Sequence, residues 1–343
     1  MFLSNLFTEN NLLIFQLFFY ASFFFINIII LFKLDFFAKR LNLYDFSKNK
    51  FHNIDTPKFG FMIFSLIYFF SLILSFQSLN LVSILLFFYL LFFLIIGYLD
   101  DVFNLNVFLR FLSSLLITIC FYKINPLNFY ISLSFVNFFN LFLLCFFTLG
   151  FIHLINITDG LNGLVPSLFL YSCIYYFFKG YNYFDQYTLN LILLSIISFI
   201  IFLLPNFLGK CFLGNSGSYS VAILSSFFYM KLYQKGVVEY SDILLIFLIP
   251  LLDGLRVTIL RIYNKKNPFK GDYSHIHFLI KDNKIQIIFF YFLIFSPSIL
   301  NFFSNDYSAV ICIMAIFLYI IFFIIIKKNI NLVASGGLEP PRE

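Results

Sequence analysis

Long apolar runs separated by short polar segments make up almost the whole chain. A helix needs about 20 apolar residues to cross a hydrocarbon core of about 30 Å. Eleven runs approach that length. The pattern therefore predicts an all-α, polytopic membrane protein with about 11 transmembrane helices. The runs cover residues 12–32, 59–78, 80–98, 107–122, 128–152, 161–178, 187–204, 216–233, 240–258, 285–303 and 308–326.

The basic residues orient these spans. If the N-terminus lies outside and the spans alternate, 18 of the 22 Lys and Arg residues fall on or toward the cytoplasm. Only Lys123, Lys179, Lys231 and Lys235 then face outside. This asymmetry is the one expected of a correctly oriented polytopic protein, and it predicts a cytoplasmic C-terminus.

Composition narrows the class further. With 62% hydrophobic and 11% charged residues, the chain is neither a disordered segment nor an ordinary soluble domain. Topology explains the net charge of +6 better than a nucleic-acid partner does. We expect a single transmembrane domain over residues 1–333. Residues 334–343 contain no Phe or Ile, so we expect a disordered tail and leave open that it is not native coding sequence.

Two adjacent carboxylates, Asp100 and Asp101, end the third run. Carboxylates beside hydrocarbon are costly, so acids at such a boundary are candidates for function. Neighbouring residues on a helix point about 100° apart, so we expect separate partners for the two. Charges that simply stop a span are the alternative.

A second polar segment runs from Asn156 to Leu164. Asn156, Asp159 and Asn162 are spaced by three, so a helical turn would place them on one face. A carboxylate between two amides suits magnesium, a sugar hydroxyl or a nucleobase edge. Ordinary Asp-Gly and Asn-Gly turns between two spans are the alternative.

Two further segments carry candidate phosphate ligands. The glycine-rich stretch 209–218 opens a span, where backbone N–H groups make a natural anion site. An N-cap by Ser216 or Ser218 also explains it. In the basic loop after residue 261, His275 and His277 would lie on one side of an extended segment, and could bind a diphosphate or, less readily, a metal.

Together these segments resemble the polyprenyl-phosphate N-acetylhexosamine-1-phosphate transferases of glycosyltransferase family 4, which include phospho-N-acetylmuramoyl-pentapeptide transferase. The similar stretches, in order, are the His52…Pro57…Gly60 segment and residues 97–101, 156–164, 212–218 and 272–277.

The resemblance implies a magnesium-dependent enzyme, with manganese as an alternative ion, in the bacterial inner membrane. Such an enzyme transfers a sugar-1-phosphate from a UDP-aminosugar to undecaprenyl or another polyprenyl phosphate at the cytoplasmic face and releases UMP. It serves the synthesis of cell-envelope polysaccharide or peptidoglycan. A homodimer is an open expectation, and no nucleic acid is expected.

The resemblance also assigns roles to residues. Asp100 would engage or deprotonate the lipid phosphate with Asp101 beside it, and His275 and His277 would contact the diphosphate. Asp159 counts among the catalytic residues and, with Asn215, would hold magnesium. The residues expected to bind substrate are Asn156, Gly160, Leu161, Asn162, Phe212, His52 and Arg261.

Three departures weaken the presumed phosphate site. Asn215 stands where the family has a metal-binding Asp, Tyr273 replaces an Arg, and Phe278 replaces the last His of its loop. Two other functions therefore remain open. One is a noncatalytic family member that binds nucleotide-sugar, and the other is a membrane transporter, against which the absence of an internal repeat and of mid-membrane charges counts.

Overall fold

The computed structural model describes residues 9–45, 55–124, 135–266, 274–280, 283–304 and 307–335. Each apolar run predicted above coincides with a helix in this part of the chain. His52 and Tyr273 lie outside the described residues, as does the expected tail except Ala334 and Ser335, which end the last helix. The helices are α1 (Glu9–Phe32), α2 (Leu34–Leu41), α3 (Gly60–Leu74), α4 (Leu81–Phe103), α5 (Val107–Ile124), α6 (Phe135–Thr158), α7 (Leu164–Gly180), α8 (Gln186–Phe207), α9 (Gly214–Gln234), α10 (Tyr240–Tyr263), α11 (Ile276–Ile280), α12 (Lys284–Phe303) and α13 (Ser308–Ser335), with a 3₁₀ turn at Phe76–Ser78.

Six of the described helices are long and apolar enough to cross a bilayer. They contain Ile14–Phe32, Leu81–Phe103, Gln186–Phe207, Tyr240–Tyr263, Lys284–Phe303 and Ser308–Lys328. Helix α3 and the described part of α6 are apolar but shorter. The all-α membrane architecture therefore agrees with the helices, while the count of eleven spans and the orientation of the termini stay predictions.

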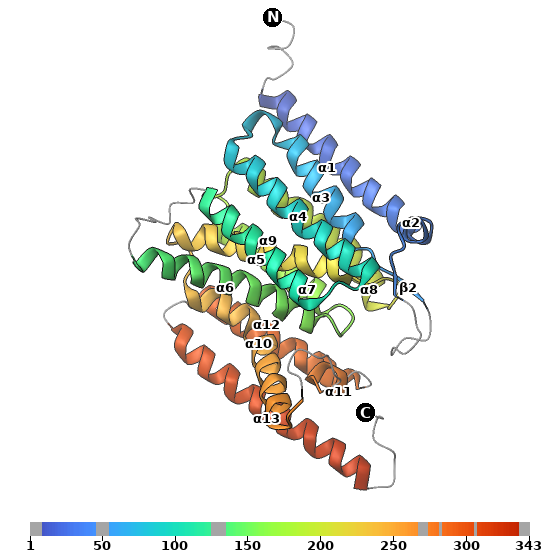
Figure 1. Cartoon of the computed structure of the whole chain (residues 1–343), viewed down its shortest axis with the longest axis vertical. Helices are drawn as coiled ribbons and strands as arrows, with labels where there is room; N and C mark the ends of the chain where they lie inside the picture. The colour runs from blue at the N-terminus through green and yellow to red at the C-terminus, as the bar shows by residue number, and fades with distance from the viewer. Residues whose placement is uncertain are drawn as a thin grey trace, which may run out of the picture. The chain divides into compact units, whose positions relative to one another are not determined.

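The chain forms two compact units. Unit 1 comprises residues 1–156 and 165–237, and unit 2 comprises residues 157–164 and 238–343. The expectation of a single domain over 1–333 stays a prediction. In unit 1, α9 packs against α3 and α4, α8 packs against α3, and α1 lies along α3 and α8 (Figure 1). Every residue of α9 from Ser216 to Met230 is buried, so this helix is the centre of the unit.

Glycines let α3, α4 and α9 approach through their backbones. A Cβ added to Gly97 on α4 would lie 2.4 Å from the Cα of Ser216 on α9. A Cβ added to Gly60 on α3 would lie 2.1 Å from the carbonyl oxygen of Leu213 and 2.5 Å from the Cα of Gly217. Any larger residue at 60 or 97 would push the first turn of α9 away. The start of α9 is thus fixed by direct backbone packing.

A polar cluster joins the other ends of α4, α8 and α9. Asp185, just before α8, accepts hydrogen bonds from Lys231 on α9 and from Thr188 Oγ1 at 2.5 Å. The Ser83 hydroxyl at the start of α4 lies 3.4 Å from the second carboxylate oxygen. Burial raises the pKa of Asp185, but the Lys231 ammonium and the hydrogen bonds to the carboxylate together outweigh it, so the pKa lies below its ordinary value.

In unit 2, α10, α12 and α13 pack against one another, and α11 contacts α12 and α13. Leu245, Leu248, Ile311 and Ala315 form a buried cluster between α10 and α13. At the start of α10, Asp242 accepts from the backbone N–H of Glu239 at 2.7 Å and from Asn301 Nδ2 on α12 at 2.9 Å. This bond ties α12 to the first turn of α10.

Candidate active site

Two short backbone ladders fix the segment before α3 against the loop before α9. Strand β1 (Tyr44–Asp45) pairs antiparallel with β2 (Thr56–Pro57). The next residue, Lys58, forms a parallel bridge with Phe212. Phe212 donates its N–H to the Pro57 carbonyl at 2.9 Å, and its own carbonyl accepts from Phe59 at 2.8 Å. Lys58 is therefore placed beside the first turn of α9.

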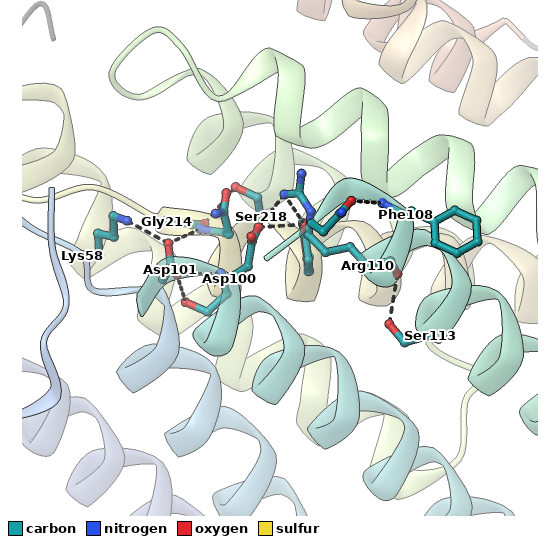
Figure 2. Close-up of polar contacts among 12 residues, drawn as sticks. Lys58, Asp100, Asp101, Phe108, Arg110, Ser113, Gly214 and Ser218 are labelled. Carbon is teal, nitrogen blue, oxygen red and sulfur yellow. Dashed lines mark hydrogen bonds and ion pairs between the residues drawn. The ribbon is translucent and has the colours of Figure 1, made fainter. Parts of the chain in front are cut away.

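Asp101 caps the first turn of α9. Its carboxylate accepts from the backbone N–H groups of Asn215 and Ser216, both at 2.9 Å, and from the Ser216 hydroxyl at 2.9 Å. Lys58 Nζ lies 3.0 Å from the same carboxylate (Figure 2). The Asp101 side chain is fully buried. A negative charge at a helix N-terminus with a lysine beside it is well compensated, so burial of this carboxylate is tolerated.

Asp100 points to a different set of partners. Its Oδ2 accepts from Arg110 at 2.5 Å and from the Tyr219 hydroxyl at 3.1 Å. Arg110 also donates to Tyr219 at 3.2 Å, so the three groups close a ring of contacts between α4, α5 and α9. The two neighbouring carboxylates thus have separate partners, as the helical geometry predicted. We call Asp100, Asp101, Lys58, Arg110 and Tyr219 the paired-aspartate cluster.

In the topology predicted from the basic residues, the helix ends in this cluster all fall on the cytoplasmic side. The paired-aspartate cluster joins the C-terminal end of α4 to the starts of α5 and α9 and to Lys58, which lies just before α3. Which side of the membrane this cluster occupies stays a prediction.

The expectation of an open anion site at the start of α9 is wrong for the first turn. The N–H groups of Asn215 and Ser216 are already bonded to Asp101. The alternative of a serine N-cap is wrong as well, because the Ser216 hydroxyl also bonds Asp101 and Ser218 Oγ donates back to the Gly214 carbonyl at 3.0 Å. The capping group comes from α4, 114 and 115 residues away in sequence from the two N–H groups, so the local sequence pattern could not predict it.

Residues 159–163 form a turn between two helices, so the expected helical face over residues 156–162 does not form. Helix α6 ends at Thr158 and α7 starts at Leu164. Gly160 donates its N–H to the Thr158 carbonyl at 2.8 Å. Gly163 adopts a φ of 84°, in the left-handed region that favours glycine. The Asp-Gly and Asn-Gly pairs therefore end one helix and begin the next, while Asn156 stays on α6.

In unit 2, a second buried cluster surrounds Asp253 on α10. His275 Nδ1 lies 2.9 Å from Asp253 Oδ2, and Arg256 NH2 lies 2.7 Å from Oδ1. The Tyr319 hydroxyl on α13 donates to Oδ1 at 3.3 Å. The backbone N–H of Ile276 lies 3.3 Å from both oxygens. We call these five residues the Asp253 cluster.

The other predicted site residues of unit 2 lie in α11, in α10 and in the turn before α7. His277 belongs to the short helix α11, so it is not part of an extended segment with His275, and its side chain is outside the described part. Arg261 lies within α10, which runs further than predicted, and is buried. Asn162 accepts from the Tyr291 hydroxyl through its backbone carbonyl at 3.3 Å. Asp159 and Leu161 are half-buried, and Gly160 is exposed.

The side chains of unit 1 do not fit a divalent cation as they stand. Both carboxylates of the paired-aspartate cluster already contact a positive charge, and Asn215 offers only a neutral amide. Burial raises the pKa of the Cys211 thiol to about 12, so without a bound metal ion it is a neutral thiol at neutral pH. Among the described residues, no three His, Cys, Asp or Glu side chains gather as a metal site.

Comparison with known proteins shows what the chain is similar to. Residues 81–233 match the family model of glycosyl transferase family 4. This confirms the resemblance drawn from the motifs, and the matched stretch contains the paired aspartates, the 159–163 turn and the start of α9. The chain is also 28% identical over 184 residues to the undecaprenyl-phosphate alpha-N-acetylglucosaminyl 1-phosphate transferase of Thermotoga maritima. That similarity covers 53% of this chain and 56% of the relative, so it spans about half the length of each.

Sequence reasoning missed six residues that the clusters depend on: Lys58, Arg110, Tyr219, Asp253, Arg256 and Tyr319. Two of them carried a signal. Arg110 is the fourth residue of an apolar run, and Asp253 lies inside the ninth run, where a charge is unexpected. Lys58 looked like one more basic residue beside a span. Tyr219 was indistinguishable from the many aromatic residues of the chain.

Proposed function

We propose that this chain transfers a sugar-1-phosphate, most simply N-acetylhexosamine-1-phosphate, from a UDP-sugar to polyprenyl phosphate at the cytoplasmic membrane face. An oxygen of the lipid phosphate forms a bond to the β-phosphorus of the UDP-sugar. The bond from that phosphorus to the bridging oxygen breaks, and UMP leaves with the electron pair. The observation that carries the proposal is the paired-aspartate cluster, whose members other than Lys58 lie within residues 81–233, the stretch that matches the family.

The paired-aspartate cluster supports this chemistry through charge. Phosphoryl transfer depends mainly on positioning and on neutralising negative oxygens. The Lys58 and Arg110 side chains are 14% and 23% exposed, while the Asp101 and Asp100 side chains behind them are 0% and 3% exposed. The cations are therefore the more accessible members of each pair. We assign Arg110 and Lys58 to attract phosphate oxygens, and Asp100 to receive the acceptor proton once Arg110 turns to the substrate.

The decisive experiment is a UMP-release assay. Purified protein in detergent receives UDP-N-acetylglucosamine and undecaprenyl phosphate, and UMP is expected only when both are present. The Asp242→Asn variant is a matched control, because this buried carboxylate lies at the start of α10 and only ties helices together. Absence of UMP across a panel of UDP-sugars, while the Thermotoga relative is active in the same assay, would contradict the proposal.

Magnesium binding, with Asn215 as one expected ligand, is a separate proposal that no step above uses. Asn215→Asp should lower the magnesium concentration needed for half-maximal UMP release, because a carboxylate binds Mg²⁺ more strongly than an amide does. A magnesium titration of both proteins measures this. An unchanged titration curve would remove Asn215 from the magnesium site.

A noncatalytic binder is the second candidate function. The amide at position 215 and the two carboxylates already compensated by cations favour it. Binding of UDP-N-acetylglucosamine, measured by calorimetry, without any UMP release would identify that function.

A further inference from the structure

Asp253 is a buried carboxylate that the proposed chemistry does not use. It is 4% exposed and lies ten residues before the end of α10. A carboxylate in such a place is costly unless hydrogen bonds and opposite charge satisfy it. Its contacts therefore show what the protein gains from keeping it there.

Those contacts come from three separate elements. Arg256 on the same helix donates from NH2 at 2.7 Å and from Nε at 3.2 Å. Tyr319 donates from α13 at 3.3 Å. His275 and the backbone N–H of Ile276 belong to the segment that leads into α11. Arg256, Tyr319, His275 and the Ile276 N–H all contact the same Asp253 carboxylate.

Arg256 strengthens the same link. Its NH2 also donates to the Ser274 carbonyl at 2.6 Å, and its guanidinium stacks 4.4 Å from the centre of the Phe323 ring. The positions before and after His275 are thus both bonded through their backbones, Ser274 to Arg256 and Ile276 to Asp253. The segment is held on both sides of the histidine.

The bond to the histidine ring has a chemical consequence. A carboxylate beside Nδ1 favours the tautomer or charge state that carries a proton on that nitrogen, and it fixes the plane of the ring. The imidazole is 6% exposed, so it has little freedom to choose another orientation. The chemistry of His275 is then confined to Nε2.

We propose that Asp253 is a positioning residue for His275, which it sets in one ring orientation while anchoring the start of α11. This rests on the proposed function in one respect only, namely that His275 contacts the diphosphate of the donor. Asp253 itself does not touch substrate. It acts on the reaction through the histidine, with Arg256 and Tyr319 keeping its own carboxylate in place.

The first test measures the anchor without any activity. Hydrogen–deuterium exchange of a peptide covering residues 274–280 is compared between the wild-type protein, Asp253→Asn and Asp242→Asn. Asp253→Asn should raise exchange in this peptide, because the amide weakens the bond to the Ile276 N–H and disturbs Arg256. Asp242→Asn, a buried carboxylate at the far end of the same helix, should leave it unchanged. Equal protection in all three proteins overturns the proposal.

The second test asks whether Asp253 acts through His275. UMP release is measured for Asp253→Asn, His275→Asn and the double variant. Asp253→Asn should lower kcat/KM by about 10- to 100-fold, the equivalent of one hydrogen bond to a charged group. The double variant should be no worse than His275→Asn alone, because the carboxylate has nothing left to position. Multiplicative losses would show that Asp253 acts independently and would overturn the proposal.

The two tests separate the two proposals. If the wild-type protein releases no UMP while the exchange difference is present, the proposed function fails and the anchoring role of Asp253 stands. If UMP is released and the exchange difference is absent, the positioning role fails and the function stands.

Discussion

Asp100 in unit 1 and Asp253 in unit 2 are each held by one arginine and one tyrosine. In both, the tyrosine hydroxyl bonds the carboxylate and the arginine as well. The supports differ. Asp100 and its partners lie on helices α4, α5 and α9, and backbone packing at Gly97 sets α4 against α9. His275, by contrast, lies outside the long helices, and its place depends on Asp253 and Arg256.

This difference separates two ways of making a site precise. Where helices touch through glycines, the scaffold sets the geometry and the polar groups are free to meet substrate. Where a connecting segment carries the functional group, polar bonds must supply the geometry themselves. We therefore expect changes in the paired-aspartate cluster to act on chemistry or on folding, and changes in the Asp253 cluster to act on the order of one segment.

The largest effect is expected from Asp100→Asn. It removes the proposed proton acceptor and leaves Arg110 without its counter-charge, so UMP release should fall by about 100- to 10,000-fold. The measurement is initial rate with saturating UDP-N-acetylglucosamine and undecaprenyl phosphate. Asp185→Asn, which removes a carboxylate from the other end of the same unit, should stay near the wild-type rate. A smaller loss for Asp100→Asn than for Asp253→Asn would break the comparison.

Gly97→Ala should be the next largest, and it tests the scaffold. The added methyl would lie 2.4 Å from the Cα of Ser216, so α4 and α9 must separate. Overpacking of this kind costs about 1–3 kcal/mol. Gly150→Ala is the matched control, because a Cβ there has nothing within 4 Å. Unfolding midpoints in detergent should fall for Gly97→Ala and not for Gly150→Ala, and equal midpoints would contradict scaffold control.

The helices were largely predictable from the sequence, because each apolar run is long enough to indicate a helix by itself. The site was predictable only in part. Asp100 and Asp101 were identified, but their partners Arg110 and Lys58 lie in other elements and become visible only once α4, α5 and α9 pack. The turn at 159–163 was misread because a spacing of three fits one helix face as well as successive turns. Asp253 was overlooked because a single acid in an apolar run has no motif around it.

The smallest effect is expected at Asp185. Its side chain is 36% exposed and is paired with Lys231. Because its folded-state pKa lies below the ordinary value of about 3.9, its stabilising contribution is present above that value. It is lost as pH falls through the lower folded-state pKa. Asp185→Asn should therefore lower the unfolding midpoint slightly at pH 7, and the difference from wild type should shrink below about pH 4. If the difference in unfolding midpoint between Asp185→Asn and wild type grew below pH 4, the lowered pKa of Asp185 would be contradicted.

Helix α9 has one more consequence, and it concerns biogenesis. Its buried stretch from Ser216 to Met230 contains serines at 216, 218, 220, 225 and 226, and it is not among the six helices apolar enough to cross a bilayer unaided. Such a segment gains little from partitioning into lipid by itself. We expect helices already in the membrane to receive it during synthesis, and α3 and α4, which precede it in the chain, both pack against it. We therefore expect that α3 and α4 must be synthesised and inserted before α9 for the centre of unit 1 to form.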